Sequence, residues 1–133
     1  MTRKELSQIY YLNRELQMWE RELNEIIQAS QITGQNIDGM PFQQTNATSD
    51  KVSETAIRIV NKMEAVKAMK DTIEKHKEEV YRYIATLDDS ILRQIVKYRC
   101  IDLMSWTKVA RMIGGGNTAD GLRMMYTRAI PEK

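Results

Sequence analysis

The chain has 133 residues, of which 42% are hydrophobic and 29% charged, with 20 lysines and arginines against 18 aspartates and glutamates. This length fits one domain, or a helical hairpin with one small domain, and a formal net charge of +2 does not by itself require a polyanionic partner. The single cysteine, Cys100, excludes an internal disulfide and fits a reducing cytoplasm.

Charge is distributed unevenly along the chain. Residues 1–87 carry 12 basic and 13 acidic residues, a net charge of −1, whereas residues 88–133 carry 8 and 5, a net charge of +3. Charged residues also recur throughout the first 25 positions, which excludes the apolar core of a signal peptide. We therefore expect a cytoplasmic protein that has no membrane contact and whose basic part is C-terminal.

The first predicted helix begins at Thr2, because Thr2-Arg3-Lys4-Glu5 has the form of a capping box. Apolar residues then recur at alternating steps of three and four, which is typical of a coiled-coil seam. They are Ile9, Leu12, Leu16, Trp19, Leu23 and Ile26. Residues 30–49 combine glycine and proline with Gln, Asn, Thr and Ser, and this composition predicts a flexible polar loop.

A second long helix is predicted after this loop, with Asp50 as its N-cap. The same spacing continues through Val52, Ala56, Ile59, Met63, Val66, Lys70, Ile73, Lys77, Val80, Ile84 and Leu87. Two seams joined by a loop predict a long antiparallel, coiled-coil-like hairpin over residues 1–87. Such a hairpin is a plain bundle core, a spacer or a means of self-association, and a homodimer is one expected assembly.

Residues 88–133 predict three shorter helices. Asp88 to Ser90 suit the start of the first, Ser105 the start of the second, and Asn117 or Thr118 the start of the third. Glycines 114–116 follow the second helix, where a left-handed residue often ends a helix. Together these features predict an all-α chain in which the hairpin is followed by a C-terminal helix-turn-helix domain, residues 88–133.

The segment DDSILRQIVKYRCIDLMSWTKVARMIG resembles the start of region 4 of sigma factors, and LRMMYTRAI is similar to the recognition helix. The layout of the chain resembles small phage-encoded proteins of Gram-positive bacteria, the ArpU- and RinA-type transcription regulators. This resemblance implies DNA binding in a bacterial host cell, with host RNA polymerase as a further partner. Leu103 departs from the pattern, since glycine is common at that position. The turn is also about two residues longer, so Leu122 reaches the core only if Gly115 and Gly116 are extra turn residues.

If Leu122 points to the core, the outward face of the last helix would approach base edges in the major groove. The base-reading candidates are Thr118, Ala119, Asp120, Arg123, Met124 and Thr127. Arg123 suits bidentate contact with guanine. The phosphate-binding candidates are Ser105, Thr107, Lys108, Arg111, Asn117 and Arg128. The plain alternative is that these side chains form a solvated helix surface.

Three functions fit this pattern. The first is a sequence-specific phage transcription regulator that binds double-stranded DNA. The second is a DNA-packaging component resembling a small terminase subunit, and the third is a protein-interaction module that contacts RNA polymerase. Residues 114–118, GGGNT, lack the lysine of a phosphate-binding loop, and His76 is the only histidine. We therefore expect no enzymatic activity, no cofactor and no metal site.

Overall fold

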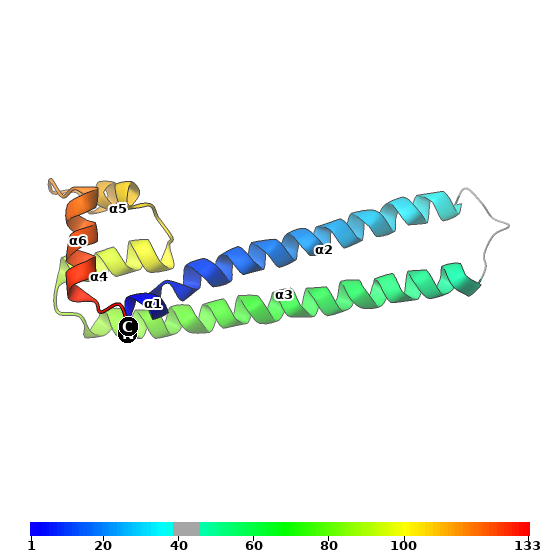
Figure 1. The fold of residues 1–133 in the computed structure, drawn as a ribbon, viewed down its shortest axis with the longest axis horizontal. Helices are drawn as coiled ribbons and strands as arrows, with labels where there is room; N and C mark the ends of the chain where they lie inside the picture. The colour runs from blue at the N-terminus through cyan, green and yellow to red at the C-terminus, as the bar shows by residue number, and fades with distance from the viewer. Residues whose placement is uncertain (39–45) are drawn as a thin grey trace. The chain divides into compact units, whose positions relative to one another are not determined.

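The computed structural model describes residues 1–38 and 46–133, which are helical without any strand (Figure 1). The elements are α1 (Arg3–Leu6), α2 (Gln8–Asp38), α3 (Asn46–Thr86), α4 (Ser90–Val96), the π-helix η1 (Lys97–Ile101), α5 (Trp106–Ile113) and α6 (Ala119–Ala129). Side chains are described for residues 1–31 and 52–133. Among the described residues, no helix combines the length and apolar character needed to cross a membrane.

The predicted capping box forms at the start of α1. The Glu5 amide donates to Thr2 Oγ1 at 3.2 Å, and the Thr2 amide donates to Glu5 Oε2 at 3.3 Å. These two bonds satisfy amides that the first helical turn leaves without intrahelical partners. Ser7 then separates α1 from α2, and its hydroxyl donates to the Lys4 carbonyl.

The long helices extend into the segment predicted as a loop. Residues 30–38 belong to α2 and residues 46–49 to α3, so Asp50 lies inside a helix and is not its N-cap. A long helix adds one backbone hydrogen bond per residue once nucleated, and one interior glycine costs only about 1 kcal/mol. Polar composition alone therefore did not mark the helix ends. The rest of the predicted loop, 39–45, lies outside the described residues.

The chain divides into two compact units, one formed by Arg14–Asp71 and the other by Met1–Asn13 together with Thr72–Lys133. The unit that contains the C-terminal helices thus also includes α1, the first turns of α2 and the last part of α3. It extends beyond the expected domain 88–133 because residues far apart in sequence share its core.

In the unit 14–71, α2 and α3 pack together. Lys62 Nζ lies 2.5 Å from Glu22 Oε2 and 5.3 Å from the centroid of the Trp19 ring, while Lys70 Nζ lies 3.7 Å from Glu20 Oε1. The same unit buries Val66 and Met69 of α3. Two long helices pack against each other, as the apolar repeats predict.

The register of the α3 seam differs from the prediction at alternate positions. Val66, Ile73 and Val80 are buried as expected, but Met69 is buried instead of Lys70, whose side chain is 59% exposed. Val52, Ala56 and Met63 are also exposed. The predicted and observed registers share Val66, Ile73 and Val80, which are seven residues apart. The heptad spacing alone does not say whether the seam position between two of them comes after three residues or after four. The apolar Met69 decides the choice, since a buried ammonium needs a partner.

The second unit has a core that joins both ends of the chain. Its buried members are Leu6, Ile9, Val80, Leu92, Val96, Cys100, Ile101 and Ile130. The Arg3 amide donates to the Pro131 carbonyl at 2.7 Å, and Arg3 Nε donates to the Ile130 carbonyl at 3.0 Å. Figure 1 shows α1 beside the end of the chain that follows α6.

A second cluster in this unit joins α4, α5 and α6. Ile95, Val109 and Leu122, one from each helix, have no exposed surface. Trp106, Tyr126 and other partly buried side chains surround them. Leu122 therefore occupies the core position expected for it, which fixes the face that α6 turns inward.

The connection between α4 and α5 explains one departure from the region-4 pattern. After η1, the Asp102 amide donates to the Lys97 carbonyl and the Met104 amide donates to the Tyr98 carbonyl. Leu103, between them, has a φ of 57° and is the one non-glycine residue with positive φ in the described ranges. Glycine adopts this conformation without a steric penalty, whereas leucine does so at a cost.

Candidate nucleic-acid interface

The turn between α5 and α6 is built from consecutive left-handed glycines. Gly114, Gly115 and Gly116 have φ values of 69°, 65° and 78°. Asn117 closes the turn, because its side-chain amide donates to the Gly114 carbonyl at 2.8 Å and its backbone amide donates to the same oxygen at 3.2 Å. One side-chain N–H of this phosphate candidate is thus engaged within the turn.

Two hydroxyl candidates are helix caps. Ser105 Oγ accepts from the Lys108 amide at 3.3 Å at the start of α5, and Thr118 Oγ1 accepts from the Gly121 amide at 3.0 Å at the start of α6. In both bonds the hydroxyl is the acceptor. Each hydroxyl therefore keeps its own proton, which it can donate to a phosphate oxygen while the cap stays formed.

The base-reading candidates lie on the exposed side of α6. Asp120, Arg123 and Met124 are exposed, and Ala119 is half-buried. Arg123 Nη2 lies 3.7 Å from Asp120 Oδ1, and both side chains are largely in solvent, so this ion pair contributes at most about 1 kcal/mol. The Arg123 guanidinium can therefore leave Asp120 and bind another acceptor at little cost in free energy.

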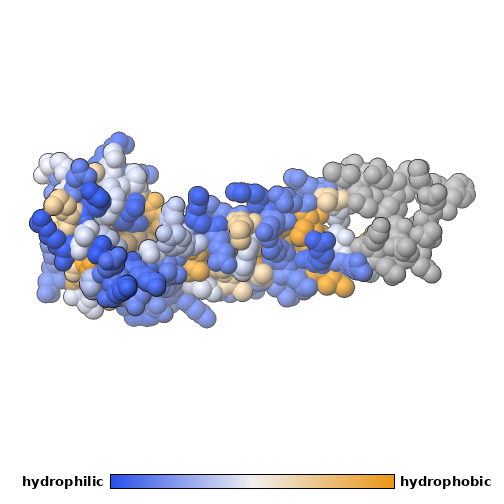
Figure 2. All heavy atoms as spheres, in the orientation of Figure 1, coloured by the Kyte–Doolittle hydropathy of each residue, from blue (hydrophilic) through white to orange (hydrophobic). Residues whose placement is uncertain are grey.

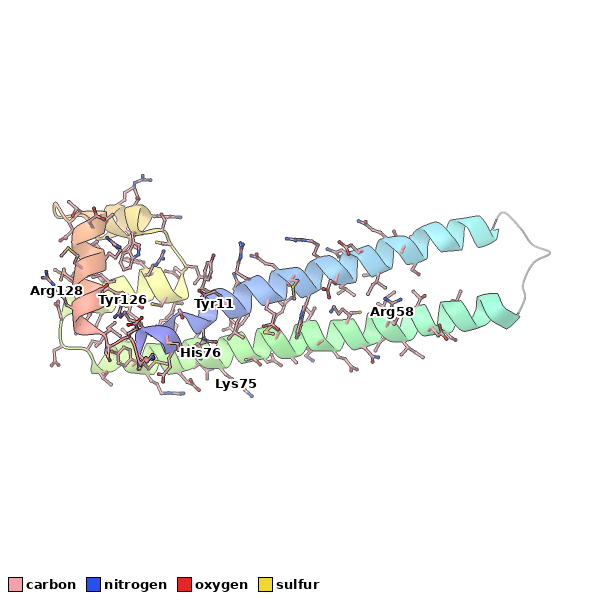
Figure 3. All side chains as sticks on the ribbon, in the orientation of Figure 1. Tyr11, Arg58, Lys75, His76, Tyr126 and Arg128 are labelled. Atoms are coloured by element: carbon pink, nitrogen blue, oxygen red, sulfur yellow. The ribbon has the colours of Figure 1, made fainter. Side chains whose placement is uncertain are left out.

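The remaining candidates flank this face. Thr127 is exposed, and its hydroxyl donates to the Arg123 carbonyl at 2.9 Å, which leaves its oxygen as an acceptor. Arg128 points from α6 away from the other helices, in contrast to Tyr126, which points inward (Figure 3). Thr107, Lys108 and Arg111 are exposed on α5.

A groove of about 700 Å³ brings some of these residues together with side chains from the N-terminal segment. The C-terminal helices and their connections contribute Arg99, Cys100, Leu103, Ser105, Trp106, Arg123, Tyr126 and Thr127. The N-terminal segment contributes Arg3, Leu6, Ser7, Tyr10 and Tyr11. The groove thus joins three candidates, Ser105, Arg123 and Thr127, and leaves Thr107, Lys108, Arg111, Asn117, Thr118, Ala119, Asp120, Met124 and Arg128 outside its lining.

Arg99 is held in a fixed position at this groove. Its Nη1 donates to the Met104 carbonyl at 2.8 Å, and its guanidinium carbon lies 5.0 Å from the centroid of the Trp106 ring. Trp106 in turn packs on Tyr126, with ring centroids 5.5 Å apart. A guanidinium stacked on an aromatic ring keeps N–H donors at its edge for an anionic acceptor.

Cys100 is the free cysteine of the chain. It is buried, and burial raises its pKa from 9.0 to about 11. The hydroxyl of Tyr126 lies 3.6 Å from its sulfur, and burial also raises the pKa of Tyr126. Both groups are therefore protonated at neutral pH, which favours packing and disfavours nucleophilic chemistry.

The N-terminal contributors to the groove were not predicted from the sequence. Arg3, Ser7, Tyr10 and Tyr11 lie more than 80 residues before the helices that they face, and the seam pattern concerned only their apolar neighbours. One local signal was present. Tyr10 and Tyr11 are adjacent aromatic residues outside the seam, and they are 47% and 61% exposed.

A second hollow, of about 470 Å³ in the unit 14–71, differs from the groove in its charge. It is lined by Glu22, Glu25, Arg58 and Lys62 together with Ile26 and Asn61, so its acidic and basic groups balance. Among the described residues, no group of three or more His, Cys, Asp or Glu side chains is arranged to hold a metal ion.

Comparisons of the chain with protein-family models, curated proteins and solved structures find no match.

Proposed function

We propose that the chain is a sequence-specific DNA-binding transcription regulator, of the kind found in phages, in which α5, the glycine turn and α6 form a helix-turn-helix. The observation that carries this proposal is the cluster of Ile95, Val109 and Leu122, one fully buried residue from each of three successive helices. A helix-turn-helix places its second helix in the major groove while the first helix crosses the backbone.

The rotation of α6 supports the choice of base-reading residues. With Leu122 fully buried, Asp120, Arg123 and Met124 lie on the exposed side of the helix. The major groove admits an α-helix, and arginine is the commonest side chain to bind guanine through two hydrogen bonds. Arg123 is therefore our first candidate for sequence recognition.

Phosphate contacts are assigned to the start of α5. Ser105 caps this helix, and the exposed Thr107, Lys108 and Arg111 follow it. Such contacts position a protein on the duplex without reading its sequence. The net charge of +3 on residues 88–133 agrees with this assignment.

The test begins with selection of duplexes from a random library by the full chain, followed by binding titrations at several salt concentrations. Arg123→Ala is expected to weaken binding by about 1–3 kcal/mol and to relax the preference at one base. Lys108→Ala is expected to weaken binding to all sequences and to reduce the salt slope by about 1. Lys75→Ala is the matched control, because this exposed lysine lies on α3 outside the proposed interface (Figure 3).

Recovery of no enriched duplex would contradict the proposal, as would an Arg123→Ala variant with the affinity and base preferences of the parent. Binding of RNA polymerase without DNA binding would instead favour the protein-interaction module.

A second role, assembly into a homodimer through α2 and α3, is favoured by exposed apolar residues on α3. Val52, Val60 and Met63 are each more than half exposed and, with Ala56, follow one another at steps of three or four. Figure 2 shows hydrophobic surface beside the grey atoms on this pair of helices. Such a stripe is typical of a helix that packs against another helix.

Sedimentation velocity tests this second role. A dimer that Met63→Lys dissociates, and that Asn61→Lys on the same helix leaves intact, would support the homodimer. A monomeric parent would contradict it, and a ring of many copies would favour the DNA-packaging alternative.

A further inference from the structure

We propose that the groove between the N-terminal segment and α6 binds one sugar–phosphate strand of the same duplex that α6 reads. This inference rests on the proposed function and adds to it a second contact surface, formed by α1 and the first turns of α2. The groove and all residues that line it belong to one compact unit, residues 1–13 and 72–133.

The charge of the lining favours an anion. Arg3, Arg99 and Arg123 all line the groove, and none of the described residues in its lining is acidic. Asp120, which pairs with Arg123 at 3.7 Å, lies outside the lining. Cationic side chains in a groove with apolar walls concentrate the field on an incoming phosphate.

Two of these cations are positioned before any ligand binds. Arg3 is held through Nε, which donates to the Ile130 carbonyl, and Arg99 through Nη1, which donates to the Met104 carbonyl. A guanidinium has five N–H donors in a planar fork, so each retains donors that suit phosphate oxygens. Less side-chain entropy is lost when such groups bind a phosphate, because their rotamers are already restricted.

Hydroxyl and aromatic groups complete the surface. Tyr10 and Tyr11 are exposed and lie edge to face, with ring centroids 5.3 Å apart, and both line the groove. Ser7 and Thr127 also line it, but their hydroxyls donate to the Lys4 and Arg123 carbonyls, so we assign them no phosphate contact. Tyrosine and arginine are among the side chains that contact the DNA backbone.

Continuity with α6 favours a DNA strand over a small anion. Arg123 and Thr127 both line the groove and belong to the proposed base-reading face, and Ser105 is a proposed phosphate contact. A sugar–phosphate strand that borders the major groove at α6 would therefore reach the lining that contains Arg99 and the tyrosines of the N-terminal segment. Phosphate contacts of this kind fix the register of the protein on the duplex.

The test uses opposite charges at Tyr11, which is 61% exposed and thus tolerates substitution. On the selected duplex, Tyr11→Glu is expected to weaken binding about tenfold because a carboxylate repels phosphate, and Tyr11→Arg is expected to strengthen it. Tyr81→Glu and Tyr81→Arg are matched controls, since Tyr81 is 48% exposed in the same unit and does not line the groove. In a hydroxyl-radical footprint, the Tyr11→Glu variant should lose protection of the DNA backbone at one edge of the site. Its base preferences should be those of the parent.

The outcomes separate this inference from the proposed function. If Arg123→Ala and Lys108→Ala weaken binding while both Tyr11 variants bind like the parent, the groove assignment is wrong and the helix-turn-helix assignment stands. If Tyr11→Glu and Tyr11→Arg weaken binding equally, the position acts through structure and the inference is overturned. A Trp19→Phe variant leaves Trp106 as the fluorescent tryptophan beside the groove. If ATP quenches its fluorescence saturably while duplex DNA leaves the fluorescence unchanged, the groove binds a small anion and the inference is overturned.

Discussion

Arg3 Nε donates to the backbone carbonyl of Ile130 at 3.0 Å, which connects two residues 127 positions apart in the sequence. The Arg3 amide donates in parallel to the Pro131 carbonyl at 2.7 Å. The N-terminal segment is thereby held against the end of the chain, and Leu6, Ile9 and Ile130 are fully buried beneath this contact.

Arg3→Ala is predicted to lower the free energy of unfolding by about 1–3 kcal/mol, since a partly buried hydrogen bond from a charged donor is lost. Urea denaturation followed by circular dichroism measures this change. Lys4→Ala is the control, because Lys4 is exposed on the same helix and surface substitutions usually stay within about 0.5 kcal/mol. Equal stabilities of the two variants would show that the Arg3 side chain does not hold the two ends together.

Four helix starts were predictable because they depend on local chemistry, whereas Asp50, the expected N-cap of the second long helix, lies inside α3. Thr2, Asp89, Ser105 and Thr118 each accept a hydrogen bond from an amide in the first turn of the helix that follows. The N-terminal wall of the groove was not predictable, because Tyr11 and Arg123 come together only through the tertiary packing of a core that joins both chain ends. Burial of Leu122 was predictable only on the condition that the extra glycines belong to the turn, and their positive φ values meet it.

Leu103 offers a test of backbone strain, because its φ of 57° is costly for a residue with a Cβ atom. Leu103→Ala and Leu103→Gly both lose the packing of the leucine side chain, but only glycine relieves the strain. The glycine variant is therefore predicted to be more stable than the alanine variant by about 1 kcal/mol.

The control for this comparison is the exposed Met124 inside α6. There the order should reverse, with Met124→Gly less stable than Met124→Ala by about 1 kcal/mol. Thermal melts of the four variants provide the measurement. An alanine variant more stable than the glycine variant at position 103 would mean that the segment relaxes to a negative φ.

Met69 and Lys70 test the register of the α3 seam. Met69 is 9% exposed, so Met69→Ala is predicted to reduce stability by about 2–5 kcal/mol through lost burial and a cavity. Lys70 has a 59% exposed side chain and a 3.7 Å ion pair with Glu20, so Lys70→Ala should change stability by no more than about 1 kcal/mol. Denaturant midpoints that show the reverse order would restore the register with Lys70 in the seam.

The raised pKa of the buried Cys100 thiol predicts how the free energy of unfolding depends on pH in the alkaline range. Burial raises its pKa from 9.0 to about 11 in the folded chain, so the unfolded thiol releases its proton first as the pH rises. The folded state then binds more protons than the unfolded state, and linkage requires stability to fall across this interval. The contribution is fully present below about pH 9 and is lost progressively as the pH rises to about 11.

Urea midpoints measured between pH 7 and pH 11 check this prediction, with Cys100→Ala as the comparison. The alanine variant is less stable at neutral pH, since it loses buried volume, but its midpoint should fall less steeply above pH 9. Tyr126 acts in the same direction, because burial and the neighbouring thiol both raise its pKa, so a residual loss of stability at alkaline pH is expected in the variant.

Iodoacetamide should also label the folded parent slowly at pH 8, because the thiolate is scarce and the sulfur is buried. Parallel pH profiles for parent and variant, together with rapid labelling, would place Cys100 in contact with solvent.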